Sequence, residues 1–213
     1  MTFQTPRDLL GHQLRTLYGA ELQLLAAMPC LIETVRDLRF ANALAEHRLA
    51  SEGHVTRLET CLAVLKMPLA CDISHGMSGL LVEMQGSGVG NGSRRLGHYE
   101  LAGRFQLLER FELALYANAC TLARALDELL IVHLLDHTMD DERRAEAVWL
   151  DIALEDLGSD AFLSPRFGDI ASAPTPRLAE WGGVARRAVS PVMHDLVPPL
   201  SRQDITAVSL ISR

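Results

Sequence analysis

The chain has 213 residues, of which 48% are hydrophobic and 22% charged, and this composition excludes a disordered or collagen-like chain and is typical of one well-buried core. Its 27 acidic and 20 basic side chains give a formal net charge of −7, so we expect no nucleic-acid partner, because binding to phosphates depends on an excess of Lys and Arg. No apolar run approaches the roughly 20 residues that cross a bilayer, and the N-terminal residues lack a signal-peptide pattern, so we expect a cytoplasmic protein with no membrane partner.

Two long amphipathic helices are predicted in the first third of the chain. The first, over residues 7–37, carries apolar side chains at steps of three and four, namely Leu10, Leu14, Leu17, Leu24, Met28, Leu31 and Val35. Pro29 is expected to kink this helix without ending it, because the apolar stripe continues in phase. A second stripe runs from Phe40 to Leu65 and stops before Pro68, which predicts a helical hairpin.

A long crossover connection is predicted next, over about residues 68–97. Its glycines at positions 86, 88, 90 and 92 favour an irregular backbone. The preceding residues 75–84 could form a short helix over one end of the core, and the sequence leaves this open.

Two further long helices follow the crossover. Apolar side chains mark the third from Leu101 to Leu126, and the fourth carries Leu134, Ala145, Val148 and Ile152 before it ends near Gly158. Four amphipathic helices joined by a short, a long and a short connection predict an all-α, antiparallel four-helix bundle with one crossover over residues 1–158, which is the ferritin-like connectivity.

The C-terminal residues 159–213 differ in composition, since they hold six of the nine prolines. We expect an irregular tail that is not an independent domain. The alternative is an oligomer contact formed by Trp181 and the apolar segment 205–211.

Polar residues interrupt the apolar stripe of each predicted bundle helix. They are Glu21 in the first helix, His47 and His54 in the second, Glu109 and Glu112 in the third, and Asp141 with Glu142 beside it in the fourth. A charged group in a bundle core is costly unless it is paired, hydrogen-bonded or bound to a metal. Glu21, Glu112 and Asp141 lie near mid-helix and could converge, and carboxylates with imidazoles are ligands that suit a pair of iron or manganese ions.

Four segments carry a resemblance to a known family. They are HQLRTLYGAELQLLAAMP at 12–29, EHRLASEGHVTRLE at 46–59, ERFELALY at 109–116 and HLLDHTMDDE at 133–142. In order and spacing they resemble the YciE/YciF family of ferritin-like stress proteins, over roughly residues 8–157.

The resemblance implies a helical bundle that is typically dimeric, is linked to bacterial stress responses, contains a dimetal site and has no well-established enzymatic activity. We therefore expect a homodimer, and whether the protein is an enzyme stays open. By position, the family's acids correspond to Glu21, Glu109, Glu112, and the pair Asp141 and Glu142.

The second helix departs from the family pattern. Where the family has HxxET, this chain has His47 followed by Ala50 and Ser51, so an acid is missing while His47 and His54 remain. We therefore expect a stress-related bundle whose site binds two iron or manganese ions. The missing acid leaves three alternatives, namely a weak site, a site for a single ion, or an empty site. The alternative function is a metal-free bundle that acts as a protein-interaction or structural module, with the divergent second helix and the tail as its working surfaces.

Overall fold

The computed structural model describes residues 3–85 and 94–158. The predictions for the glycine-rich part of the crossover and for the C-terminal tail, including the contact through Trp181, lie outside these residues.

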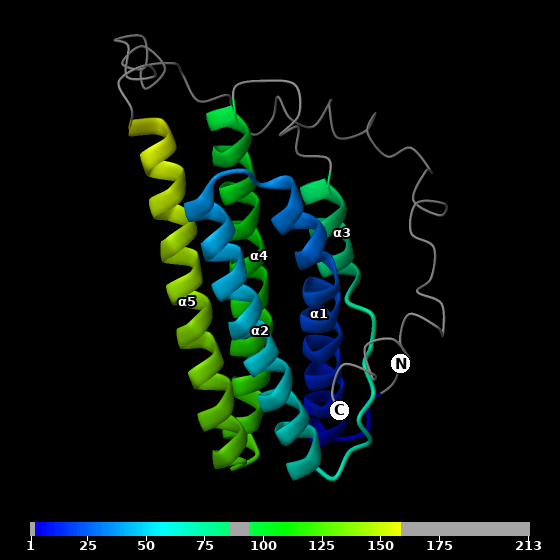
Figure 1. Ribbon diagram of the computed structural model, residues 1–213. Helices are drawn as coiled ribbons and strands as arrows, with labels where there is room; N and C mark the ends of the chain where they lie inside the picture. The colour runs from blue at the N-terminus through cyan, green and yellow to red at the C-terminus, as the bar shows by residue number, and fades with distance from the viewer. Residues whose placement is uncertain (1–2, 86–93, 159–213) are drawn as a thin grey trace, which may run out of the picture. The chain divides into compact units, whose positions relative to one another are not determined.

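The described chain consists of five helices and no strands. They are α1 (Pro6–Thr34), α2 (Leu38–Val64), α3 (His75–Gln85), α4 (Arg94–Ala125) and α5 (Leu129–Gly158). Figure 1 shows α1, α2, α4 and α5 side by side as a bundle, in which each helix is antiparallel to the neighbours it packs against. The predicted all-α, antiparallel four-helix bundle with one long crossover is confirmed. None of the described helices combines the length and the apolar character that a membrane span requires.

Local interactions set the starts of the first two helices. The Thr5 side chain accepts a hydrogen bond from the Asp8 backbone N–H (3.1 Å), and the Asp8 carboxylate accepts one from the Thr5 N–H (3.0 Å), which is a capping box. Asp37 caps α2 through the backbone N–H of Phe40 (2.9 Å). Pro29 lies inside α1, and the helix continues past it to Thr34, as predicted.

The crossover contains α3, the helix that the sequence left undecided, and α3 packs on α1 and α4. Gln23 of α1 anchors the start of α3. The Gln23 side chain donates a hydrogen bond to Ser78 Oγ (2.6 Å) and accepts one from the backbone N–H of Ser74 (3.0 Å). The chain before α3 passes so close to α1 that a Cβ atom at Gly19 would lie 1.9 Å from the carbonyl oxygen of Asp72. This position therefore requires glycine.

Two apolar clusters fill the bundle, and they occupy different stretches of the same four helices. One cluster includes Leu24, Met28, Phe40, Phe105 and Trp149, and the other includes Leu14, Leu58, Cys120, Ile131 and Leu135. Most of the buried polar residues lie where the two clusters meet, namely Glu21 on α1, His47, Ser51 and His54 on α2, Glu109 and Glu112 on α4, and Glu142 on α5. The buried His98 and Thr138 lie outside this zone. The core is thus two apolar layers separated by one polar layer.

The buried face of α5 differs from the predicted one. The predicted stripe contained Leu134 and Val148, but Leu134 is only half-buried and Val148 is 40% exposed. The neighbouring Leu135 and Trp149 are buried instead. Apolar residues stand next to each other at both places, so the periodicity alone could not choose between two faces of the helix.

Candidate metal centre

The polar layer combines carboxylates and imidazoles from all four bundle helices. Its members are Glu21 of α1, His47, Ser51 and His54 of α2, Glu109 and Glu112 of α4, and Glu142 of α5, and each is buried. The spacing within each helix explains why they meet: residues three apart, such as Glu109 and Glu112, share a face, and residues seven apart, such as His47 and His54, lie two turns apart on one face.

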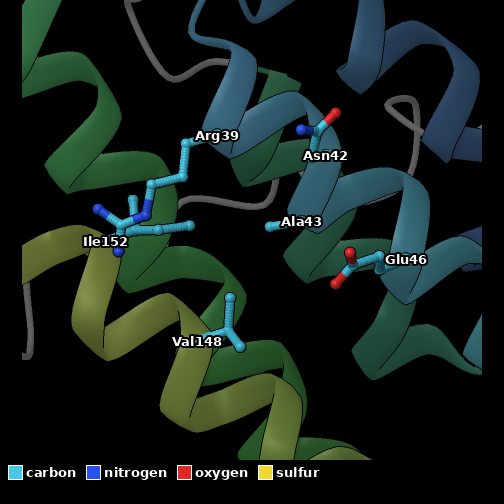
Figure 2. A pocket seen from close by; sticks show the side chains of 6 residues that line it. All are labelled: Arg39, Asn42, Ala43, Glu46, Val148 and Ile152. Carbon is cyan, nitrogen blue, oxygen red and sulfur yellow. The ribbon is translucent and has the colours of Figure 1, made fainter.

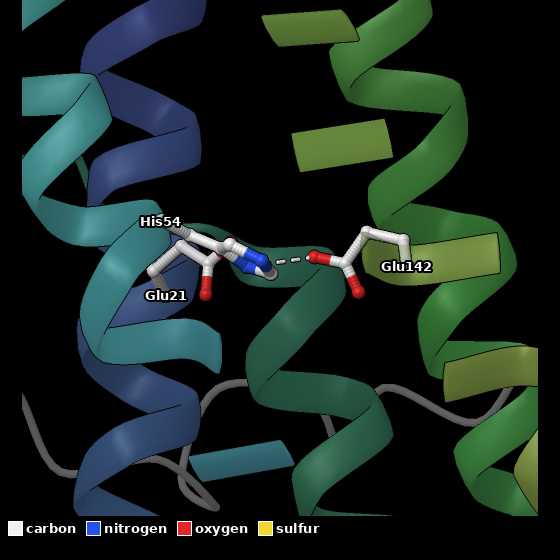
Figure 3. A group of neighbouring side chains, drawn as sticks. All are labelled: Glu21, His54 and Glu142. Atoms are coloured by element: carbon white, nitrogen blue, oxygen red, sulfur yellow. Dashed lines mark hydrogen bonds and ion pairs between the residues drawn. The ribbon is translucent and has the colours of Figure 1, made fainter. Parts of the chain in front are cut away.

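One half of the layer is centred on His54. Its Nδ1 atom lies 3.1 Å from Glu21 Oε1 and 2.9 Å from Glu142 Oε1. Figure 3 shows the Glu21 and His54 side chains on one side of the bundle core and Glu142 reaching toward them from the other. The hydroxyl of Tyr116 donates a hydrogen bond to Glu21 Oε1 (2.6 Å). Glu21, His54 and Glu142 can therefore each direct one ligand atom to a common point.

The other half is centred on His47. Its Nε2 atom lies 3.3 Å from Glu109 Oε1, and the indole N–H of Trp149 donates to the same carboxylate oxygen (2.8 Å). His47, Glu109 and Glu142 offer ligand atoms within 4.8 Å of one another. Glu142 is therefore common to both halves.

Several buried atoms of the layer have no hydrogen-bond partner among the described residues. They include both carboxylate oxygens of Glu112, both of Glu142, Oε2 of Glu21, Oε2 of Glu109, the hydroxyl of Ser51 and both ring nitrogens of His47. A buried polar group without a partner costs about 1–3 kcal/mol, and more if it is charged. Four carboxylates in one layer are thus unfavourable unless a group of opposite charge joins them.

The pKa values of three acids reflect this cost. Burial raises the pKa of Glu21, and it raises those of Glu109 and Glu112 well above the ordinary range; nearby carboxylates add to the increase for all three. Without a cation, these three acids therefore favour their protonated forms.

The pKa values of the two histidines shift in opposite directions. Burial alone would lower the pKa of His54, but the carboxylates of Glu21 and Glu142 raise it to about 10. Burial lowers the pKa of His47 to about 4, so its imidazole is neutral at physiological pH and can act as a ligand. Burial opposes ionisation of Glu142, but its close contact with His54 lowers its pKa below the ordinary value.

The structure brings five of the seven predicted site residues into the two groups of converging ligand atoms. Glu112 is buried in the same layer but belongs to neither group, and Asp141 lies at the edge. The Asp141 side chain is 15% exposed, accepts a hydrogen bond from Arg57 (2.6 Å) and also contacts Arg144. It belongs to neither group of converging ligand atoms, and Glu142 occupies the central position that the sequence pattern suggested for Asp141. The cause is the buried face of α5, which contains Leu135 and Trp149 in place of the predicted Leu134 and Val148.

Two aromatic donors were not predicted from the sequence. Tyr116 and Trp149 both read as ordinary apolar residues, and only their hydrogen bonds to Glu21 and Glu109 show their place in the layer. The one available signal was spacing, because Tyr116 follows Glu112 by four residues and Trp149 follows Glu142 by seven.

The fold and the layer define an all-α antiparallel bundle with buried carboxylates and histidines at its centre. The chain belongs to the family described as "Domain of unknown function (DUF892)", which matches residues 5–161. It is 24% identical over 167 residues to the protein YciF of Escherichia coli, a match that covers 76% of this chain and 98% of YciF. The expected relationship to the YciE/YciF family is thereby confirmed.

Two solved structures share the fold. The crystal structure of the Escherichia coli stress protein YciF matches with a TM-score of 0.70 and 22% identity, over 74% of this chain and 100% of that chain. The structure of YcfI from Rhodopseudomonas palustris matches with a TM-score of 0.66 and 24% identity, over 69% of this chain and 94% of that one.

Proposed function

We propose that this protein binds two divalent cations, iron or manganese, in the polar layer of the bundle. The observation that carries the proposal is the set of buried, unpartnered ligand atoms, which converge in two groups that share Glu142. The four carboxylates of Glu21, Glu109, Glu112 and Glu142 together balance the charge of two divalent cations, while the imidazoles add neutral ligands. The donor set therefore fits such ions in number, charge and chemical type.

Each half of the layer would hold one cation. Glu21 and His54 would bind one, His47 and Glu109 the other, and Glu142 would contribute to both, because it belongs to both groups of ligand atoms. Glu112 interacts electrostatically with Glu21 and Glu142 and adds negative charge at the centre. Iron or manganese bound there would supply one-electron redox chemistry.

The residues of this chain would control access and protonation around the ions. Tyr116 and Trp149 each donate to a carboxylate oxygen and so restrain Glu21 and Glu109. The apolar layers on both sides exclude water from the site. Ala50 contributes no carboxylate, so α2 supplies its two histidines and the Ser51 hydroxyl.

The proposal also includes the biological role: the protein would act in the stress response, as a homodimer in the cytoplasm. It is supported by the description of the Escherichia coli relative as a stress protein. Light scattering on the purified chain measures the mass in solution; twice the 23.4 kDa of one chain is expected, and the mass of one chain would contradict the dimer.

The direct test is elemental analysis of the purified protein after expression with both iron and manganese available. We expect about two equivalents of metal per chain. Glu109→Gln should lose at least one equivalent, whereas the matched control Glu100→Gln, an exposed acid on the same helix, should retain the wild-type content. A trace amount of metal in the wild-type protein would contradict the proposal.

A groove on the outer surface favours the second candidate function, a metal-free interaction or structural module. This groove of about 380 Å³ lies between α2 and α5, and it is lined by Arg39, Asn42, Ala43, Glu46, Val148 and Ile152 (Figure 2). It combines apolar side chains with both charges, as a protein-binding surface does. Elemental analysis separates the two functions, since only this candidate predicts a metal-free protein.

A further inference from the structure

The two halves of the polar layer have different surroundings, and an inference that rests on the proposed function follows from this difference. We propose that the half containing His54 binds its cation more tightly than the half containing His47, because Asp141 orients His54 from outside the ligand group. Asp141 is thus a positioning residue, and the cation in the His47 half is the more exchangeable one.

The two ring nitrogens of His54 face different partners. Its Nδ1 atom faces Glu21 and Glu142, at 3.1 Å and 2.9 Å. Its Nε2 atom lies 3.5 Å from Asp141 Oδ2, which is an ion-pair distance, and it has no hydrogen-bond partner among the described residues. Nδ1 would therefore be the ligand atom, and Nε2 would carry the proton directed at Asp141. A histidine that donates its second N–H to a carboxylate is fixed in orientation and becomes a more basic ligand.

Asp141 is itself held in place by two arginines, one of which contacts the same carboxylate oxygen, Oδ2, that faces His54. The Arg57 guanidinium donates to Asp141 Oδ2 (2.6 Å) and to Thr138 Oγ1 (2.7 Å), and Arg144 contacts the other carboxylate oxygen. The exposed ring of His137 lies 3.4 Å from Asp141 as well. Through Arg57, this network joins α2 to α5.

His47 has apolar surroundings instead. Its ring meets the rings of Phe105 and Trp149 edge to face, with centroid separations of 6.2 Å and 6.0 Å. Neither ring nitrogen has a hydrogen-bond partner within the described residues, and the nearest acid, Glu109 at 3.3 Å, belongs to the ligand group itself. Among the described residues, no acid outside the ligand group forms an ion pair with this imidazole, and ring packing holds its other side.

The expected difference in affinity between the two halves follows from the effect of carboxylates that hold metal-binding histidines in other proteins. Removing one reduces metal affinity by about 10- to 100-fold. Two neighbouring cations also repel each other, so a weaker second binding step in the wild-type protein would not by itself distinguish the halves. Each half must be measured alone.

The experiment uses Mn²⁺ as the probe and the full chain with one histidine removed. His47→Ala leaves the His54 half, and His54→Ala leaves the His47 half. Free Mn²⁺ is measured by electron paramagnetic resonance during a titration of each metal-free variant. We expect His47→Ala to bind its one ion about 10- to 100-fold more tightly than His54→Ala does. If an alanine variant does not fold, judged by thermal unfolding, the corresponding glutamine variant replaces it.

Asp141→Asn, introduced into each background, assigns the difference to Asp141. It should weaken Mn²⁺ binding about 10- to 100-fold in His47→Ala and less than about threefold in His54→Ala. Asp140→Asn is the matched control, because Asp140 is the preceding residue and is 63% exposed. It makes the same change in charge and should affect both backgrounds equally and weakly.

The outcomes separate this inference from the proposed function. If the wild-type protein binds two Mn²⁺ ions but the two halves bind with equal affinity, or if Asp141→Asn weakens both halves alike, the inference is wrong and the metal site stands. If the wild-type protein binds no Mn²⁺, the proposed function fails and the inference fails with it.

Discussion

The polar layer and the two apolar layers are built from the same four helices and are equally buried, yet their internal contacts differ in kind. In the apolar layers each side chain, such as Leu14 or Phe105, is surrounded by other apolar side chains and contributes stability by leaving water. In the polar layer, carboxylates such as Glu112 have no partner for either oxygen. Burial therefore stabilises the first kind of layer and destabilises the second.

From this difference we expect that the bundle does not need its polar layer in order to fold. A leucine at any of these positions would continue the apolar stripe and remove a desolvation cost. Acids and histidines at these positions fit the proposed metal site. Four predictions test the comparison, beginning with the largest expected effect.

Truncation in an apolar layer should reduce stability whether or not metal is present. Leu14 is fully buried, so Leu14→Ala should lower the free energy of unfolding by about 2–5 kcal/mol, through lost burial and the cavity left behind. Denaturant unfolding with and without Mn²⁺ measures this. The same truncation at the exposed Leu49 is the control and should cost much less. A loss of stability that is seen only with Mn²⁺ present would contradict the claim that the apolar layers stabilise the fold independently of metal.

Replacing an acid of the polar layer by an apolar residue should increase the stability of the metal-free protein, in contrast to truncation in an apolar layer. Glu112→Leu should raise the stability of the metal-free protein by about 1–3 kcal/mol, because it removes a buried carboxyl group that has no partner. The same variant should bind less metal. Thermal unfolding of the metal-free protein checks the first effect, with the exposed Glu100→Leu as control. Destabilisation by Glu112→Leu would mean that Glu112 has a structural role.

The metal-free protein should become less stable as the pH rises from 6.5 to 9. The pKa of His54 is about 10 in the folded chain against about 6.5 when unfolded, and the pKa values of Glu109 and Glu112 are raised too, so in this range the folded state holds more protons. The stability from these groups is complete below the unfolded pKa values and is lost as the pH rises through the folded ones.

The measurement is the melting temperature across this pH range, without metal and with saturating Mn²⁺. Metal binding requires deprotonated acids, so the stabilisation by Mn²⁺ should increase with pH while the metal-free melting temperature falls. Glu112→Gln should flatten the metal-free profile. A profile independent of pH would show that the layer does not titrate differently on unfolding.

The smallest effect is expected from Tyr116→Phe. This substitution removes the hydrogen bond of 2.6 Å to Glu21 while keeping the aromatic ring in its apolar surroundings. It should cost the metal-free protein about 1 kcal/mol, which shifts the melting temperature by roughly 2–4 °C in a chain of this size. The exposed Tyr99→Phe is the control. An unchanged melting temperature would show that the hydrogen bond to Glu21 adds nothing to stability.

The sequence by itself determined the number of bundle helices, their order and the long crossover. Apolar side chains at steps of three and four recur strongly enough to define each helix, and the connections of different length then limit how the helices can pack. The sequence also singled out Glu21, His47, His54 and the two acids of α4, because each interrupts an otherwise apolar stripe. These are local patterns, which one helix carries in full.

Only the tertiary structure decided which face of α5 points inward. Asp141 and Glu142 are neighbours with apolar residues on both sides, and the packing of Trp149 against Phe105 and Phe40 fixes the rotation that buries Glu142 and leaves Asp141 beside Arg57. The hydrogen bonds of Tyr116 and Trp149 to Glu21 and Glu109 join residues that are 95 and 40 positions apart. No periodicity within a single helix contains such contacts, because they depend on how the helices rotate and pack against one another.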